Sequence, residues 1–310
     1  MQVTAVTGFY DVGRANYDHR TPQEYIGWLN LTLQLPLPFL VFLDPAFDAS
    51  GVVLKPEDRI VRVAKADLTM FRHRARIEEI VATSQTVNRR DISFHVAEYG
   101  MIVMSKLELL KRAAKLTDAE YLVWIDAGHC RRYPDFGDRT VKVTDADFAG
   151  MRFGLHTTLH LAQRMRIGKF QRRMVGTTLA MMSAADFIVA RDFAEELSDR
   201  MDFMVQTEWL PAGLWDNEQV AIGTLLFRGG LPGARIMGTH VGGGANAVNW
   251  LFGAPPYDRK PPLYVRWRLL LDEFRTRRAP PDECYLPGDF PEAAFQAWTK
   301  ARHSENGIGA

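Results

Sequence analysis

Apolar and polar residues follow one another in blocks that predict an α/β protein. Short apolar runs of strand length lie at residues 2–9, 39–43, 59–63 and 121–125. Between them, residues 70–84 and 99–116 repeat their apolar positions at helical spacing. Because strand and helix patterns alternate, we predict a mixed, mainly parallel central sheet flanked by helices.

The clearest helix start is the segment that begins at Thr21. Thr21 can cap the helix, Pro22 suits its first position, and Glu24 completes the spacing of a capping box. The apolar positions continue to Leu33, and Pro36 ends the pattern because proline lacks the amide that a helix interior needs. A helix is therefore predicted between these prolines.

The second half of the chain gives weaker patterns. We predict two further strands, at residues 148–153 and 175–182. Two further helices are predicted at residues 183–201 and 216–227. The first of these helices is expected to be capped by Ser183. Beyond Trp250, frequent prolines separate short helical stretches. We therefore divide the chain into a domain of residues 1–254 and a C-terminal helical appendage of residues 255–310.

Residues 121–125, YLVWI, form an uninterrupted apolar run that stops at Asp126. Such a run is typical of a strand that helices cover on both faces, so it is the predicted sheet centre. Ligands of open α/β sheets bind outside the carboxyl ends of strands, which makes Asp126 a candidate site residue. The alternative is that Asp126 only caps the turn made with Ala127 and Gly128.

Composition and charge narrow the function classes. The chain has 310 residues, of which 47% are hydrophobic and 24% charged, as in ordinary globular proteins. A net charge of +1 gives no general attraction to nucleic acid, so no such partner is expected. Cys130 and Cys284 form no metal-binding or disulfide motif. Signal-peptide and membrane-spanning patterns are not recognisable, so a cytoplasmic protein is expected.

Three motifs in order carry a resemblance to a known family. The segments TGFYDVGRANY, YLVWIDAGHCRR and WDNEQV resemble those of the HtrL/YibB-type (WlaTC-like) bacterial glycosyltransferases, over roughly residues 2–245. The resemblance implies a GT-A-like fold and transfer of a sugar from a nucleotide-sugar donor, UDP-linked, to a glycan or lipid-linked acceptor. It also implies a place in bacterial surface polysaccharide assembly.

The resemblance further implies a divalent cation, Mn²⁺ or Mg²⁺, that an Asp-x-Asp motif holds on the donor diphosphate. Asp126 matches the first aspartate, whereas Gly128 occupies the second position. Several related enzymes add a C-terminal histidine, which His240 matches. We expect Asp126 and His240 to bind the metal together with phosphate oxygens and water. The alternatives are a buried structural imidazole at His240 and a metal-independent site.

The nucleotide-binding residues are expected in two loops. Thr7, Tyr10 and Arg14 lie at the end of the first strand and in the loop that receives the nucleotide in the GT-A fold; Tyr10 could stack on uracil and Arg14 could bind a phosphate. In the second loop, the amides of Gly242 and Gly243, in a run that continues to Gly244, could cradle the diphosphate. The alternatives are a core Tyr10, an Arg14 paired with Asp11 or Asp18, and a flexible glycine loop.

Lys106, Asp216 and Glu218 are the candidate catalytic residues. Lysine or arginine at the position of Lys106 touches donor sugar or phosphate in related transferases, where it would offset charge on the leaving group. Glu218 or Asp216 could act as base or oxocarbenium stabiliser. Asp216 also stands at capping-box spacing from Gln219, and Lys106 could be a solvated surface charge. His129 is expected on the opposite face and is left out of the site.

A basic amphipathic stretch at residues 266–278, RWRLLLDEFRTRR, suggests peripheral membrane contact, or docking of this helix on its own domain. Two other functions remain open. A sugar-phosphate nucleotidyltransferase would release pyrophosphate from UTP and a sugar phosphate. A non-catalytic nucleotide- or carbohydrate-binding protein on the same fold would bind UDP without turnover.

Overall fold

A computed structural model describes residues 1–305 except 86, 133–139, 241–246 and 254–262. In this part of the chain, a seven-stranded sheet has the order β3-β2-β1-β4-β7-β5-β8. Its strands are β1 Val3–Phe9, β2 Phe39–Leu43, β3 Arg59–Arg62, β4 Tyr121–Ile125, β5 Phe153–Thr158, β7 Asp186–Ala190 and β8 Ala234–His240. The fold is therefore α/β with a mixed, mainly parallel sheet, as predicted, and β4 is its central strand.

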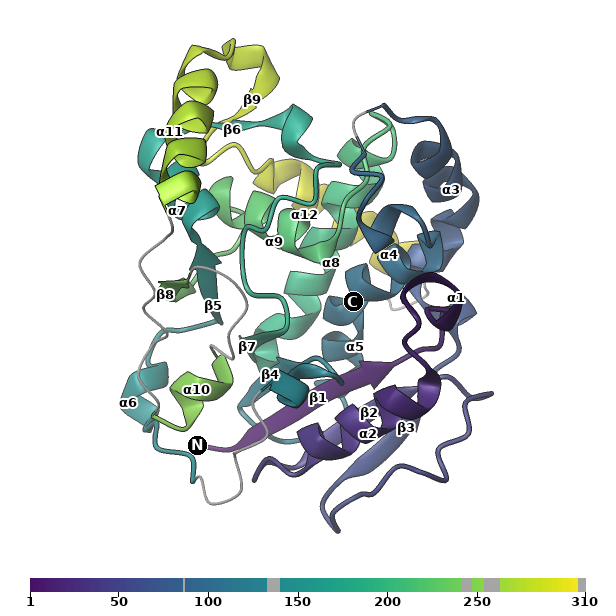
Figure 1. Cartoon of the computed structure of the whole chain (residues 1–310). Coiled ribbons are helices and arrows are strands. Elements are labelled where there is room, and N and C mark those ends of the chain that lie inside the picture. The colour runs from purple at the N-terminus through teal and green to yellow at the C-terminus, as the bar shows by residue number, and fades with distance from the viewer. Residues whose placement is uncertain (86, 133–139, 241–246, 254–262, 306–310) are drawn as a thin grey trace.

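Helices cover both faces of the sheet. Neighbouring strand residues point to opposite faces, and in the central strands both sets are apolar. In β4, Leu122 and Trp124 face one buried cluster, and Val123 and Ile125 face the other. The first cluster includes residues from α3 Arg74–Thr83, α4 Ala97–Met104, α5 Lys106–Ala113, α8 Ala194–Met204 and α9 Glu218–Phe227. The second is closed by α2 Pro22–Leu33, α6 Asp145–Phe148 and α10 Ala247–Leu251 (Figure 1).

Helix α2 confirms the local signals at its start. Thr21 accepts a hydrogen bond from the Glu24 amide, and the Glu24 carboxylate accepts one from the Thr21 amide. Pro22 occupies the first turn. The helix ends at Leu33, shortly before Pro36. The expected strands at residues 2–9, 39–43, 59–63 and 121–125 are also present within one or two residues.

Four expectations for other elements are wrong. Residues 99–116 form two helices, α4 and α5, that meet at Ser105. Phe148 ends helix α6, so the strand begins only at Phe153. Residues 175–182 contribute one isolated bridge instead of a strand. The stretch 183–201 contains β7 before α8 begins, because its apolar residues pair with β4 and β5 on either side.

Further helices and a short strand pair complete the main elements, and several of them add residues to the first cluster. These further elements are α1 Ala15–Asp18, α7 Leu159–Ile167, α11 Leu263–Arg278, α12 Glu292–Glu305 and the strand pair β6 Phe170–Gln171 with β9 Cys284–Tyr285. Phe290 and Phe295 belong to the same buried cluster as α8 and α9. The domain division at residue 254 falls at the edge of a range that the structure does not describe, and it stays a prediction.

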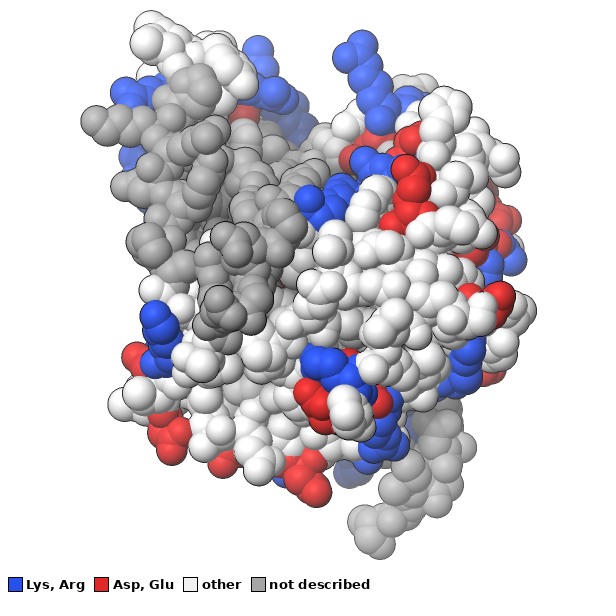
Figure 2. Space-filling view, turned by 60° about the horizontal axis from the view of Figure 1, so that its bottom comes forward, with Lys and Arg blue, Asp and Glu red and all other residues white. Residues whose placement is uncertain are grey.

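The surface carries charges of both signs. Figure 2 shows lysines and arginines interspersed with aspartates and glutamates among uncharged residues on one face. The two cysteines are buried and separate, as expected from their spacing. Within the described residues, none of the helices has both the length and the hydropathy required to traverse a bilayer.

Candidate functional site

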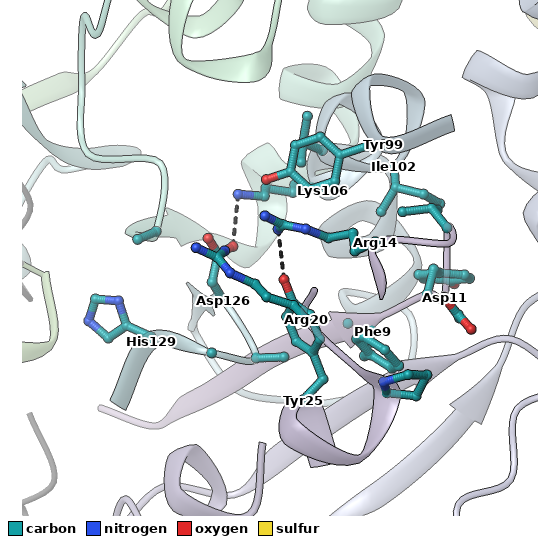
Figure 3. A pocket seen from close by; sticks show the side chains of 18 of the residues that line it. Phe9, Asp11, Arg14, Arg20, Tyr25, Tyr99, Ile102, Lys106, Asp126 and His129 are labelled. Carbon is teal, nitrogen blue, oxygen red and sulfur yellow. Dashed lines mark hydrogen bonds and ion pairs between the residues drawn. The ribbon is translucent and has the colours of Figure 1, made fainter. Parts of the chain in front are cut away.

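A pocket of about 250 Å³ opens at the edge of the sheet where the parallel strands β1 and β4 end. The loops after these two strands supply much of its wall, and α4 and α5 supply another part (Figure 3). Its polar lining residues include Asp11, Arg14, Arg20, Tyr25, Tyr99, Lys106, Asp126, His129 and Arg131. The pocket therefore lies where the sequence placed the candidate site.

Asp126 is held in one orientation by groups on the same face of the sheet. The Trp124 indole Nε1 donates to Asp126 Oδ1 over 2.7 Å, and the Lys106 Nζ lies 2.8 Å from the same oxygen. Trp124 and Asp126 are two residues apart, so extended backbone points both toward α5. The Asp126 side chain keeps 39% of its surface exposed, and no hydrogen bond to Oδ2 occurs among the described residues. This oxygen therefore remains available to a ligand.

Lys106 is a buried cation at the start of α5. Its Nζ lies 2.8 Å from Asp126 Oδ1 and from Glu218 Oε1, and it donates to the Ala184 carbonyl over 2.9 Å. Burial alone would lower the pKa of Lys106, but the two carboxylates outweigh it and raise that pKa above its ordinary value. The ammonium therefore stays charged and all three of its protons are engaged. The alternative of a solvated surface lysine is wrong.

Glu218 lies behind Lys106, away from the pocket lining, and is only 5% exposed. Burial raises the pKa of Glu218, and the Lys106 ammonium opposes this rise. Glu218 is the first residue of α9, and Asn217 caps that helix by accepting from the Gln219 and Val220 amides. The geometry thus connects Glu218 to Asp126 through Lys106.

Asp216 serves a different part of the structure, and the expected capping box with Gln219 is wrong. Its carboxylate accepts hydrogen bonds from the backbone amides of Gly176, Asn217 and Thr178. Asp216 is fully buried, and burial raises its pKa to about 7 although these amides oppose the rise. The helix starts two residues later than expected, so Asp216 orders the loop that precedes it.

Arg14 lies in the wall of the pocket. Its Nη1 donates to the Tyr25 hydroxyl over 2.7 Å, its guanidinium pairs with Asp18, and its Cζ lies 4.8 Å from the centre of the Tyr99 ring. Asp18 also pairs with Arg20, which lies in the same wall. The pairing with Asp18 was one of the expected alternatives, and Figure 3 shows the guanidinium bonded to Tyr25 in the wall of the pocket.

Tyr10 and Thr7 are more buried than a ligand-contacting role requires. Tyr10 is 5% exposed and packs in the core cluster, although it borders the pocket floor. Thr7 is fully buried within β1 and lies outside the pocket lining. Their roles in nucleotide binding stay predictions.

The second expected loop cannot be placed at the pocket. Gly242, Gly243 and Gly244 lie outside the described residues. The backbone of His240 ends strand β8, in register with Thr158, but its side chain lies outside the described part. The expected convergence of His240 with Asp126 stays a prediction.

The pocket also contains residues that the sequence analysis did not place in the site, among them Arg20, Arg131 and His129. The Arg131 Cζ lies 4.6 Å from the centre of the Trp28 ring, and His129 Nε2 lies 3.9 Å from Asp186 Oδ2. His129 was left out on the assumption that the strand continues, but β4 ends at Ile125. The arginine-rich segment after Asp126 was the available signal, because this loop follows the central strand.

The sequence matches the HtrL_YibB family, described as bacterial proteins of unknown function, over residues 1–157. The matched span is just over half of the chain. The chain belongs to the HtrL_YibB family. The matched residues include Lys106, Asp126 and all the arginines that line the pocket. The part of the pocket that these residues form therefore lies within the span matched to the family in this HtrL_YibB protein. Glu218 and His240 lie beyond it.

Among solved structures, the chain aligns with mouse xyloside xylosyltransferase 1 in its apo form. The TM-score is 0.39 at 10% sequence identity, and the alignment covers 94% of this chain and 99% of that chain. None of the curated proteins matches. A likeness of this size carries no argument about activity, which has to be argued from the pocket and its chemistry.

Proposed function

We propose that this HtrL_YibB protein is a glycosyltransferase with a GT-A-like fold that moves a sugar from a UDP-linked donor to a glycan or lipid-linked acceptor. The observation that carries the proposal is Asp126, whose Oδ1 is fixed by Trp124 and Lys106 and whose side chain lines a pocket that also contains three arginines. A fixed carboxylate suits the hydroxyl groups of a sugar or ribose, and arginines suit a diphosphate.

The proposed roles divide between the two sides of the pocket. Asp126 Oδ2 accepts a hydrogen bond from a hydroxyl group of the donor sugar or ribose. Arg14, Arg20 and Arg131 bind the diphosphate and stabilise the charge that develops as it leaves. Lys106 and Glu218 position Asp126, because the ammonium has no remaining proton for a phosphate.

For the diphosphate we propose a metal-independent site that arginines neutralise. Groups of three or more His, Cys, Asp or Glu side chains that could hold one do not occur within this part of the chain. Asp126 Oδ1 is already bound by an ammonium and an indole N–H. At Gly128, where a second aspartate would stand, an added Cβ would lie 3.2 Å from the Arg131 Nη1. The glycine thus makes room for a guanidinium, which supports a diphosphate site neutralised by arginine.

The decisive experiment measures donor hydrolysis and transfer across a panel of nucleotide sugars. We expect Asp126→Asn to fold with a lowered melting temperature, since Lys106 keeps Glu218 as its second carboxylate, and to lose turnover by about 10–100-fold, since the amide lacks the charge that strengthens the hydrogen bond to the sugar hydroxyl. Asp118→Asn, at a fully exposed carboxylate, is the matched control.

Two outcomes would replace the proposal. Release of pyrophosphate from UTP and a sugar phosphate would identify a nucleotidyltransferase. UDP binding without hydrolysis or transfer of any donor would identify a binding protein. If Asp126→Asn turns over donor at the wild-type rate, Asp126 has only a structural role in the turn after β4.

A further inference from the structure

Helix α11 presents an apolar stripe to solvent. Six large apolar side chains on it are between 54% and 73% exposed: Leu263, Tyr264, Trp267, Leu270, Leu271 and Phe274. At about 100° per residue, these positions fall within an arc of about 120° on one side of the helix. Contiguous apolar surface of this kind marks an interaction site rather than scattered exposure.

The opposite, polar side of α11 is the side that holds the helix to the protein. Arg164 of α7 is fully buried and donates to the Thr276 hydroxyl, and its Nη2 lies 3.8 Å from Asp272 Oδ2. Glu273 pairs with Arg166 of α7. A surface helix ordinarily buries its apolar side, so α11 is mounted the other way round, at the periphery of the molecule (Figure 1).

Arginines border the apolar stripe on both sides. By the same helical angle, Arg266 and Arg277 fall along one border, and Arg268 and Arg275 fall along the other. No acidic partner for Arg266, Arg268 or Arg275 occurs among the described residues, whereas Arg277 pairs with Glu273. Both acidic residues of the helix are bound by arginines of α7. The exposed side is therefore apolar along most of its centre and basic at its rims and at its C-terminal end, where Arg278 lies over the Phe274 ring.

We propose that α11 docks on the surface of an anionic lipid bilayer. Its tryptophan, tyrosine and phenylalanine suit the boundary between headgroups and acyl chains, and the bordering arginines suit anionic headgroups. The charged rims favour this surface over a second copy of the chain, because two copies would bring like charges together. The proposal goes beyond sugar transfer and does not depend on it.

Co-sedimentation with vesicles tests the proposal. We expect the full chain to bind vesicles of phosphatidylcholine mixed with phosphatidylglycerol, to bind phosphatidylcholine vesicles far less, and to dissociate at high salt. Trp267→Ser combined with Leu270→Ser should weaken binding by at least about tenfold. Arg266→Gln combined with Arg268→Gln should weaken it by about fivefold per arginine.

Two exposed residues elsewhere provide matched controls. Val53→Ser removes a side chain that is 70% exposed, and Arg72→Gln removes an exposed cation; both should bind like the wild type. Melting temperatures check that the variants fold. Equal binding to both vesicle types, wild-type binding by either α11 variant, or self-association that depends on Leu270 without vesicle binding would overturn the proposal.

Discussion

Replacing Lys106 by methionine tests the central contact of the site. The change keeps most of the side-chain volume but removes the ammonium between Asp126 and Glu218. Removing one partner of a buried ion pair typically costs about 3–5 kcal/mol, because the remaining charge stays buried. At about 2 cal/mol/K of unfolding entropy per residue, this lowers the melting temperature of the chain by about 5–8 °C.

The loss should depend on pH, because Glu218 is the carboxylate left in the interior. Burial raises its pKa in the folded protein, and the variant lacks the ammonium that opposes this rise. The unfolded chain has a glutamate pKa of about 4.3. Because folding raises the pKa of Glu218, the protonated side chain favours the folded state at low pH. This contribution is lost as the pH rises from about 4.3 through the pKa of the folded protein. The variant should therefore lose less stability at pH near 5 than at pH near 8.

Differential scanning calorimetry at both pH values measures the loss of stability. A second variant combines Glu218→Gln with Lys106→Met. The double variant should recover most of the loss at the higher pH, since it leaves no buried ionisable partner behind. A single variant that melts like the wild type at both pH values would refute the reasoning. An equal loss at both pH values would show that Glu218 is not the uncompensated charge.

Three further predictions concern the pocket and the packing. Arg14→Gln should weaken UDP binding by about 10–100-fold in calorimetry, as expected for a charge-assisted phosphate contact, while an unchanged affinity would remove Arg14 from the site. UDP should bind equally well with Mn²⁺ and with a chelator; a large loss with the chelator would restore the metal site of Asp126 and His240. Gly223→Ala should destabilise the chain by about 1–3 kcal/mol, because the new Cβ would lie 2.5 Å from the Met181 Cβ. Gly27→Ala has no atom within 4 Å of the new Cβ, so it should stabilise the helix by about 0.5–1 kcal/mol. Equal effects of the two alanines on the unfolding midpoint would contradict this packing.

The sequence by itself determined the elements whose signals lie within a few neighbouring residues. The capping box at Thr21 and Glu24 needs only a four-residue segment, and the apolar run at residues 121–125 needs no distant partner to be recognised as a buried strand. Asp126 was predictable for the same reason, because a polar residue directly after such a run lies at the carboxyl edge of the sheet.

Tertiary structure alone decided what these residues meet. Lys106 contacts Glu218 across 112 positions of the chain, and Asp216 turns to the amides of Gly176 and Thr178 instead of capping its own helix. β7 was assigned to a helix because both its faces are buried, so no alternation marks it as a strand. Pairing with β4 and β5 settles that question.

Helix α11 shows the same division most clearly. Its amphipathic spacing was readable at residues 266–278, but spacing cannot say which side faces inward. The buried Arg164 of α7 requires hydrogen-bond acceptors, and the polar side of α11 provides them through Thr276 and Asp272. A buried guanidinium without such partners would be costly, so the polar side turns inward and the apolar side faces solvent.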